Sequence, residues 1–148
     1  MNKLNAILLG IALFLPFVVG CDPATTPAIS VTEVKLHDWT DPKDGKIYVV
    51  AMPTWKNDGK VAIRQAMFSA DIKDAKGFKP KESAEPQFHG AIVEPGTTVT
   101  PQQVPEEGVI LGVKKELEDQ FGKLDESRVE VEGLGSTEEY KPPTNSDA

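Results

Sequence analysis

Two runs of alternating apolar and polar residues, joined by a four-residue turn, constrain the fold of this chain more than any other feature. In residues 46–57 (KIYVVAMPTWKN) and 61–74 (VAIRQAMFSADIKD), apolar residues recur at every second position. Such alternation is typical of strands with one buried face. Because the intervening Asn57-Asp58-Gly59-Lys60 has turn chemistry, we expect a β-hairpin, with Trp55 in the core. Pro53 has no amide hydrogen, so an unpaired position or a sheet edge is expected there.

Other segments also show an alternation of apolar and polar residues. Residues 29–36 alternate imperfectly, which indicates an edge strand or a bulge. Residues 88–104 predict two short strands around a tight turn at 94–97, and residues 127–134 predict a last strand with Glu130 and Glu132 facing solvent. Residues 113–124 instead predict a short helix that Gly122 stops or bends, since apolar side chains recur there at helical spacing: Val113, Leu117, Phe121 and Leu124.

Short strands separated by turns at intervals of about 10 residues, in a domain of about 100 residues, favour an all-β fold. We expect an immunoglobulin-like β-sandwich of antiparallel strands with one short helix at residues 29–135. A small barrel and an α+β meander are the alternatives. Residues 21–28 have linker composition, and residues 136–148 are expected to be a disordered tail.

The first twenty residues have the layout of a secretory signal peptide. Lys3 is the only charged residue among them, and an uncharged, mostly apolar stretch runs from Ala6 to Val19. A permanent transmembrane helix is the weaker interpretation. The stretch is shorter than the roughly 20 residues that span a bilayer, and Pro16 interrupts it.

The chain's single cysteine stands where this apolar run ends. Val18-Val19-Gly20-Cys21 resembles the lipobox of bacterial lipoproteins. The resemblance implies cleavage between Gly20 and Cys21, a diacylglycerol on the Cys21 thiol, and a further acyl chain such as palmitate on the new amino group. Two or three acyl chains make a stable anchor where one gives marginal binding. With that thiol consumed, none remains for a disulfide, a zinc site or redox chemistry.

The resemblance also implies a location in the bacterial cell envelope, with the domain outside the cytoplasm. Asp22 resembles the signal for retention in the inner membrane, but this rule varies among bacteria and leaves inner and outer membrane both open. The net charge of −7, with acids and bases interleaved, argues against binding to nucleic acid or to anionic lipid head groups.

A second resemblance concerns the mature domain. Three stretches with shared turn residues are similar to the FxLYD-type sandwich modules of bacterial envelope proteins: Trp55 to Gly59, Ala70 to Gly77 and Ile92 to Gly96. The sequence departs from that pattern at the positions that name it, with Ala70 for Phe and Lys73 for Tyr. The resemblance implies a non-catalytic extracytoplasmic module and transfers no catalytic residue.

Few residues suggest catalysis, metal binding or ligand binding. His37 and His89 are candidate general bases, but no G-x-S-x-G motif or free cysteine accompanies them, so exposed strand-end histidines are the simpler interpretation. Asp38, Asp41 and Asp44 offer carboxylates for Ca²⁺, although their spacing departs from D-x-D-x-D-G and suits a solvated turn. Trp39, expected in a polar loop, is the best candidate for a ligand contact.

These observations favour a non-enzymatic lipoprotein that acts as an adaptor or binding module for another, unidentified envelope protein. A Ca²⁺- or glycan-binding module that uses the loop from Asp38 to Asp44 and Trp39 is the alternative. No cofactor is expected.

Overall fold

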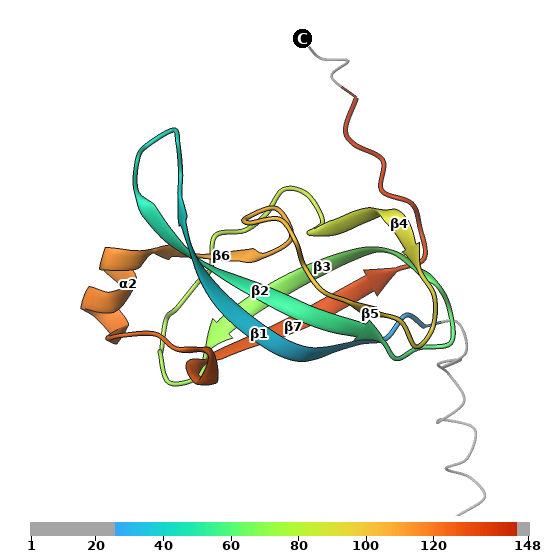
Figure 1. Ribbon diagram of the computed structural model, residues 1–148, viewed down its shortest axis with the longest axis horizontal. Helices are drawn as coiled ribbons and strands as arrows, with labels where there is room; N and C mark the ends of the chain where they lie inside the picture. The colour runs from blue at the N-terminus through green and yellow to red at the C-terminus, as the bar shows by residue number, and fades with distance from the viewer. Residues whose placement is uncertain (1–25, 145–148) are drawn as a thin grey trace, which may run out of the picture.

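Two antiparallel sheets pack face to face in the computed structural model, which describes residues 26–144 (Figure 1). The expected signal peptide (1–20), Cys21 and most of the linker lie outside the described residues. The first sheet contains β1 (Ile29–Thr40), β2 (Ile47–Asn57), β5 (Thr98–Val99) and β6 (Val109–Val113). The second contains β3 (Ile63–Ile72), β4 (Phe88–Val93) and β7 (Val129–Ser136). The chain also forms α2 (Lys114–Phe121) and the 3₁₀ turn η2 (Glu126–Arg128).

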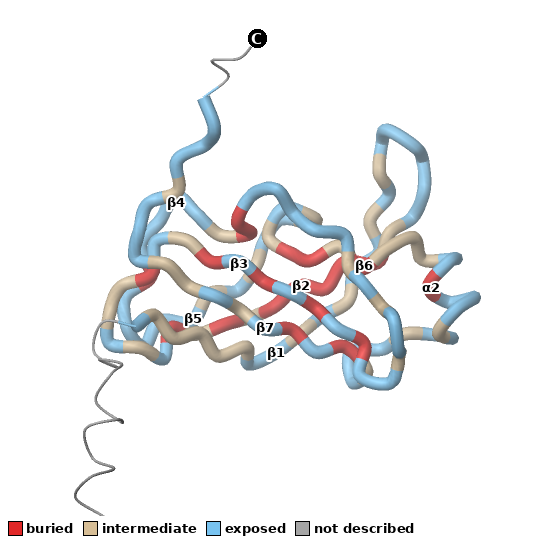
Figure 2. Tube along the Cα trace, turned by 180° about the vertical axis from the view of Figure 1, so that it is seen from behind, coloured by how far each residue is buried: buried red, intermediate tan, exposed pale blue. Residues whose placement is uncertain are grey.

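The core lies between the two sheets, where buried positions follow the middle strands (Figure 2). Trp55 of β2 is 2% exposed, and its ring centroid lies 5.8 Å from that of Phe68 in β3 and 5.3 Å from that of Phe88 in β4. Burial of Trp55 follows the alternation of its strand. The predicted all-β sandwich with one short helix is therefore confirmed.

The predicted hairpin is wrong in its pairing. β2 pairs with β1, β5 and β6, whereas β3 pairs with β4 and β7, so the turn at 57–60 carries the chain from one sheet to the other. Burial alternates along most of β3, as predicted, whereas in β2 residues 49–53 are all buried, on both faces of the strand. The apolar faces of the two strands meet across the core instead of lying side by side on one face. The tight turn at 94–97 also forms, with Thr97 N–H donating to Glu94 O at 3.1 Å, and it too connects strands of different sheets.

Pro53 occupies the unpaired position that its missing amide hydrogen predicts. On one side β2 pairs along its whole length with β1, and Val34 faces Pro53. On the other side β6 pairs with residues 48–51 and β5 with residues 55–56. Pro53 falls in the gap between these two short strands, where no ladder hydrogen bond is required of it.

β1 is longer than its alternation predicts. It has the expected bulge, between Val31 and Glu33, and continues to Thr40, which pairs with Ile47. Trp39 therefore lies in a strand and not in a polar loop, because β2 begins early enough to extend the hairpin as far as the turn at 41–46. The end of this hairpin projects beyond the two sheets (Figure 1).

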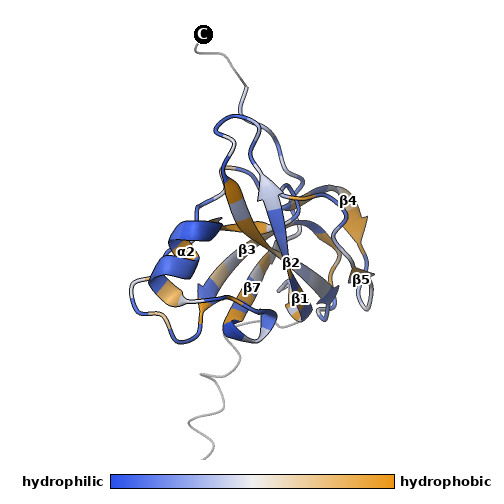
Figure 3. Ribbon diagram, turned by 60° about the vertical axis from the view of Figure 1, so that its left-hand side comes forward, coloured by the Kyte–Doolittle hydropathy of each residue, from blue (hydrophilic) through white to orange (hydrophobic). Residues whose placement is uncertain are grey.

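The helix and the last strand follow their sequence patterns. α2 ends at Gly122, which has a φ of 76° and donates its N–H to Glu118 O. Leu117 is buried against the sandwich, whereas the outward surface of α2 is hydrophilic (Figure 3). In β7, Val129 is buried and Glu130 exposed, as predicted. After β7 the chain passes beside β4, where the Tyr140 ring lies 4.9 Å from that of His89.

Candidate functional site

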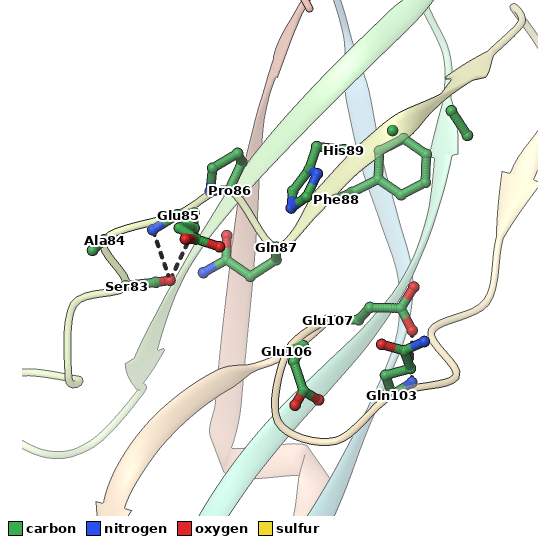
Figure 4. Close-up of a pocket in the computed structure, with 12 residues that line it drawn as sticks. Ser83, Ala84, Glu85, Pro86, Gln87, Phe88, His89, Gln103, Glu106 and Glu107 are labelled. Atoms are coloured by element: carbon green, nitrogen blue, oxygen red, sulfur yellow. Dashed lines mark hydrogen bonds between the residues drawn. The ribbon is translucent and has the colours of Figure 1, made fainter. Parts of the chain in front are cut away.

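A groove with a volume of about 670 Å³ runs along the outer rim of β4. This volume is within the range of ordinary ligand pockets. The segment from Ser83 to Ala91 forms one wall, and Gln103, Glu106 and Glu107 form the other (Figure 4). The first wall belongs to the β3–β4 connection and β4, and the second to the loop between β5 and β6. The groove therefore lies where the rims of the two sheets meet.

Hydrogen bonds and packing fix the first wall. Ser83 Oγ donates to Glu85 O at 2.7 Å, which closes a small turn. Gln87, only 7% exposed, accepts the N–H of Phe68 through Oε1 at 2.8 Å. Phe88 then turns its ring inward onto Trp55. The wall is thus attached both to β3 and to the core, which makes it a stable surface rather than a loose loop.

The second wall is held by one carboxylate. Glu107 Oε2 accepts the backbone N–H groups of Gln102 and Gln103, each at 2.6 Å. Gly108 then brings the chain close to β2, since a Cβ there would lie 2.4 Å from Met52 Sδ and 2.6 Å from a Val50 methyl carbon. This close approach explains why both side chains are buried on the outer face of the first sheet.

The groove is negatively charged. Its lining contains three glutamates and one histidine, and no lysine or arginine. The Glu107 carboxylate holds its own loop, but those of Glu85 and Glu106 make no hydrogen bond or ion pair within residues 26–144. Both residues are exposed. Such a lining favours a positively charged ligand.

The two histidines lie in different sheets. His37 is on β1, opposite Val50, and His89 is on β4, where its ring contacts Tyr140. His89 also lines the groove. Ser83, in the groove wall, donates its hydroxyl to the backbone oxygen of Glu85. The groove as a whole presents hydrogen-bonding and charged groups, which suit the binding of a ligand.

The three aspartates near the first turn have separate roles. The Asp38 carboxylate accepts a hydrogen bond from Lys114 Nζ at 2.7 Å, and this contact raises the pKa of Lys114. Asp41 accepts the N–H of Lys43, and Asp44 accepts the N–H of Lys46, both at 2.8 Å. Within residues 26–144, no group of three His, Cys, Asp or Glu side chains is arranged to hold a metal ion.

Trp39 lies beside a tyrosine on the projecting hairpin. The centroids of the Trp39 and Tyr48 rings are 5.8 Å apart, and Lys81 Nζ lies 5.8 Å from the Tyr48 centroid. Tyr48 donates its hydroxyl to Asp44 Oδ2 at 2.6 Å. This hydrogen bond raises the pKa of Tyr48 to about 12 and lowers that of Asp44. Trp39 is half-buried and thus retains a surface for contact.

Sequence reasoning missed Gln87 and Glu106. Gln87 stands in FKPKESAEPQ, which the sequence predicts only as a polar connection. Its burial depends on a hydrogen bond to Phe68, nineteen positions earlier. The position of Glu106 depends on how the β5–β6 loop folds back toward β4. No local pattern in the sequence marks either residue.

Comparison of the chain with protein-family models, with characterised proteins and with solved structures finds no match. No helix within the described part of the chain is long and apolar enough to cross a membrane.

Proposed function

We propose that this chain is a non-enzymatic lipoprotein of the bacterial cell envelope, anchored through Cys21, whose sandwich domain is an adaptor or binding module for another envelope protein. The groove beside β4 is the observation that carries the binding role. It is large, it is built on a firmly packed wall, and it contains two carboxylates without partners among residues 26–144.

The anchored location rests on the sequence. A signal-peptide-like run ends at the chain's single cysteine, and a proline- and threonine-containing stretch follows it. Residues 26–28 already lie against the domain, where Ala28 O accepts the N–H of Asp58 at 2.9 Å. Fully extended at about 3.1 Å per residue, residues 22–25 would add about 12 Å. That length keeps the domain close to the lipid head groups, within reach of neighbouring envelope proteins.

In-cell cross-linking of the tagged full chain, followed by mass spectrometry, tests this function. The expected result is one dominant envelope protein, captured by the wild-type chain and lost with Cys21→Ala. Absence of any enriched protein would contradict the adaptor role. So would turnover of a hydrolase substrate by the purified chain, if His37→Ala or His89→Ala abolished it.

Glycan binding by the projecting hairpin is a second candidate, favoured by the adjacent Trp39 and Tyr48 rings. Aromatic faces offer stacking surfaces, and this pair lies near the end of the β1–β2 hairpin, which projects beyond the two sheets (Figure 1). Titration with oligosaccharides is expected to quench the fluorescence of Trp39 and leave that of buried Trp55 unchanged. An identical response in Trp39→Phe would eliminate this candidate.

A further inference from the structure

The outer face of the second sheet carries three exposed large apolar side chains. Met67 of β3 and Leu134 of β7 lie directly opposite each other and are 49% and 80% exposed. Ile92 of β4 is 53% exposed and precedes the buried Val93, so it points to the same outer side. Within residues 26–144 one other large apolar side chain is exposed, that of Ile47 on the distant hairpin. This face therefore gathers most of the large apolar side chains that the domain exposes.

The same face is acidic toward its other end. The strands β3, β4 and β7 contain three carboxylates, those of Asp71, Glu130 and Glu132, and all three are exposed. Asp71 and Glu130 lie opposite each other, and Glu132 lies between them and the level of Leu134. The apolar part and the acidic part of the face are thus separated along the direction of the strands.

The chain enters the domain at the apolar end of this face. Residues 26–28 lie beside the end of β7, since a Cβ on Gly135, the residue after the exposed leucine, would lie 3.1 Å from Pro27 Cβ. Residues 22–25, fully extended at about 3.1 Å per residue, span about 12 Å. A lipid on Cys21 would therefore hold this end of the domain close to the bilayer surface.

We infer that the outer face of the second sheet docks on the bilayer to which Cys21 is anchored, with Leu134, Met67 and Ile92 among the head groups of zwitterionic lipid. This inference rests on the lipid anchor of the proposed function. The tether lets the domain rotate but not leave the surface, and the apolar end of this face gains most by leaving water. The acidic end is repelled by anionic lipid, so the domain tilts, and the first sheet faces away from the membrane.

The anchor makes a weak contact sufficient. Burial of one large apolar side chain favours docking about tenfold or more, which is too little to hold a free protein on a membrane. Docking of an anchored domain is intramolecular, so the same contact acts at a high effective concentration of lipid. Three apolar side chains near the tether are therefore enough to orient the domain.

The test uses the lipidated chain, purified from bacterial membranes and reconstituted in phosphatidylcholine vesicles. Because lipid occupies the single natural cysteine, an introduced cysteine is the only free thiol and carries the fluorophore NBD. Ser69→Cys places the label on the outer face of β3, two positions from Met67, and Lys35→Cys places it on β1 in the other sheet. Both positions are exposed. Quenching by phosphatidylcholine that bears a nitroxide near its head group reports contact with the bilayer.

The expected result is quenching of the label at Ser69→Cys and none at Lys35→Cys. Adding Met67→Ser/Leu134→Ser should lower the ratio of docked to undocked domain about tenfold or more, because two apolar side chains no longer leave water. Ile47→Ser, which removes an exposed apolar side chain from the hairpin, is the control and should leave the quenching unchanged. All three substituted side chains are exposed, so the fold should tolerate these changes.

Equal quenching at the two labelled positions, or quenching at Ser69→Cys that Met67→Ser/Leu134→Ser leaves unchanged, would overturn the inference. So would NBD emission at Ser69→Cys that responds to the density of protein in the vesicles and not to the nitroxide lipid, because the face would then contact a second copy. Flotation of the chain with the vesicles reports the anchor separately. A chain that floats without quenching retains the proposed anchor and lacks the docked face, whereas a chain without lipid on Cys21 overturns both.

Discussion

Asn57 joins the two sheets through its side chain. It is fully buried, and its Nδ2 donates to Val61 O at 2.8 Å and to Val93 O at 2.9 Å, while its Oδ1 accepts Gly59 N–H at 3.0 Å. One amide thus satisfies three backbone groups around the crossing from β2 to β3. Buried backbone groups that lose their only partner are costly.

Asn57→Ala should therefore lower the free energy of unfolding by about 3 kcal/mol, because it leaves buried carbonyl groups unpaired. Chemical denaturation measures the change. The control is Asp58→Ala, the exposed neighbour, which should cost less than about 1 kcal/mol. Equal denaturation midpoints for the two variants would contradict this role of Asn57.

At the scale of single residues, the sequence predicted the turn at 57–60 but not the hydrogen bonds that the Asn57 side chain makes. Asn57-Asp58-Gly59-Lys60 is recognisable as a turn from its residue types alone. The bond from Asn57 to Val93 spans thirty-six positions, so it exists only once both sheets are assembled. The same holds for the contact between Gln87 and Phe68, on which the groove depends.

The hydrogen bond between Tyr48 and Asp44, at the end of the β1–β2 hairpin, can be tested through the pKa of Tyr48. The hydrogen bond to Asp44 raises the pKa of Tyr48 to about 12, above the ordinary value of 10.0. The neutral phenol is favoured in the folded state, so this contribution to stability is complete below pH 10 and is lost as the pH rises toward 12.

In a Tyr140→Phe background, absorbance at 295 nm reports Tyr48 alone. We expect ionisation with a pKa of about 12. Asp44→Asn should move the midpoint toward 10, because the charge that favours the protonated phenol is gone. A midpoint that Asp44→Asn leaves unchanged would show that another group controls Tyr48.

At the scale of elements, β7 packs closely against the rest of the sandwich because the inward positions of its second half have no side chains. Val129 and Val131 fill the core, and the next inward positions are Gly133 and Gly135. A Cβ on Gly133 would lie 2.6 Å from Phe68 Cε1 and 2.8 Å from Ile29 Cγ2. The two glycines thus allow β1 and β3 to approach β7 closely.

Gly133→Ala should destabilise the fold by about 1–3 kcal/mol, since neither the packed Phe68 ring nor Ile29 can move aside cheaply. Gly135→Ala is the matched variant on the same strand. Its Cβ would meet Ile63 and Pro27 no closer than 3.1 Å, so its cost should be smaller. Thermal unfolding of both variants provides the comparison, and the reverse order would refute this packing.

The elements themselves were largely predictable, and their partners were not. Alternation identified β2, β3 and β7, helical spacing identified α2, and the missing amide of Pro53 predicted a gap in the ladder. Alternation states which face of a strand is buried but not which strand lies beside it. The pairing of β2 with β3 was therefore wrong, although each strand was correctly placed on the core.

β6 carried too weak a signal to be predicted. Its sequence, VILGV, is short and apolar without alternation, and its position beside β2 depends on the close approach at Gly108. This approach also places Glu106 on the groove wall. Neither β6 nor the second wall of the groove was predicted from the sequence, because both depend on contacts between residues distant in the chain.

At the scale of the whole molecule, the proposal divides the chain into an anchor, a short stalk and a rigid domain. In this proposal, a lipid on Cys21 would confine the domain to the membrane surface, and the groove beside β4 would offer the partner an acidic site. Confinement raises the effective concentration of two membrane proteins for each other, so a weak groove contact suffices for stable association.

Intact-mass spectrometry of the full chain, expressed in a bacterial host and purified from its membrane fraction, tests this account most directly. We predict an N-terminus at Cys21 with the added mass of a diacylglycerol, with or without a further acyl chain, and no lipid on Cys21→Ala. A chain with an unmodified Cys21 thiol, or with any other N-terminus, would contradict the anchored adaptor.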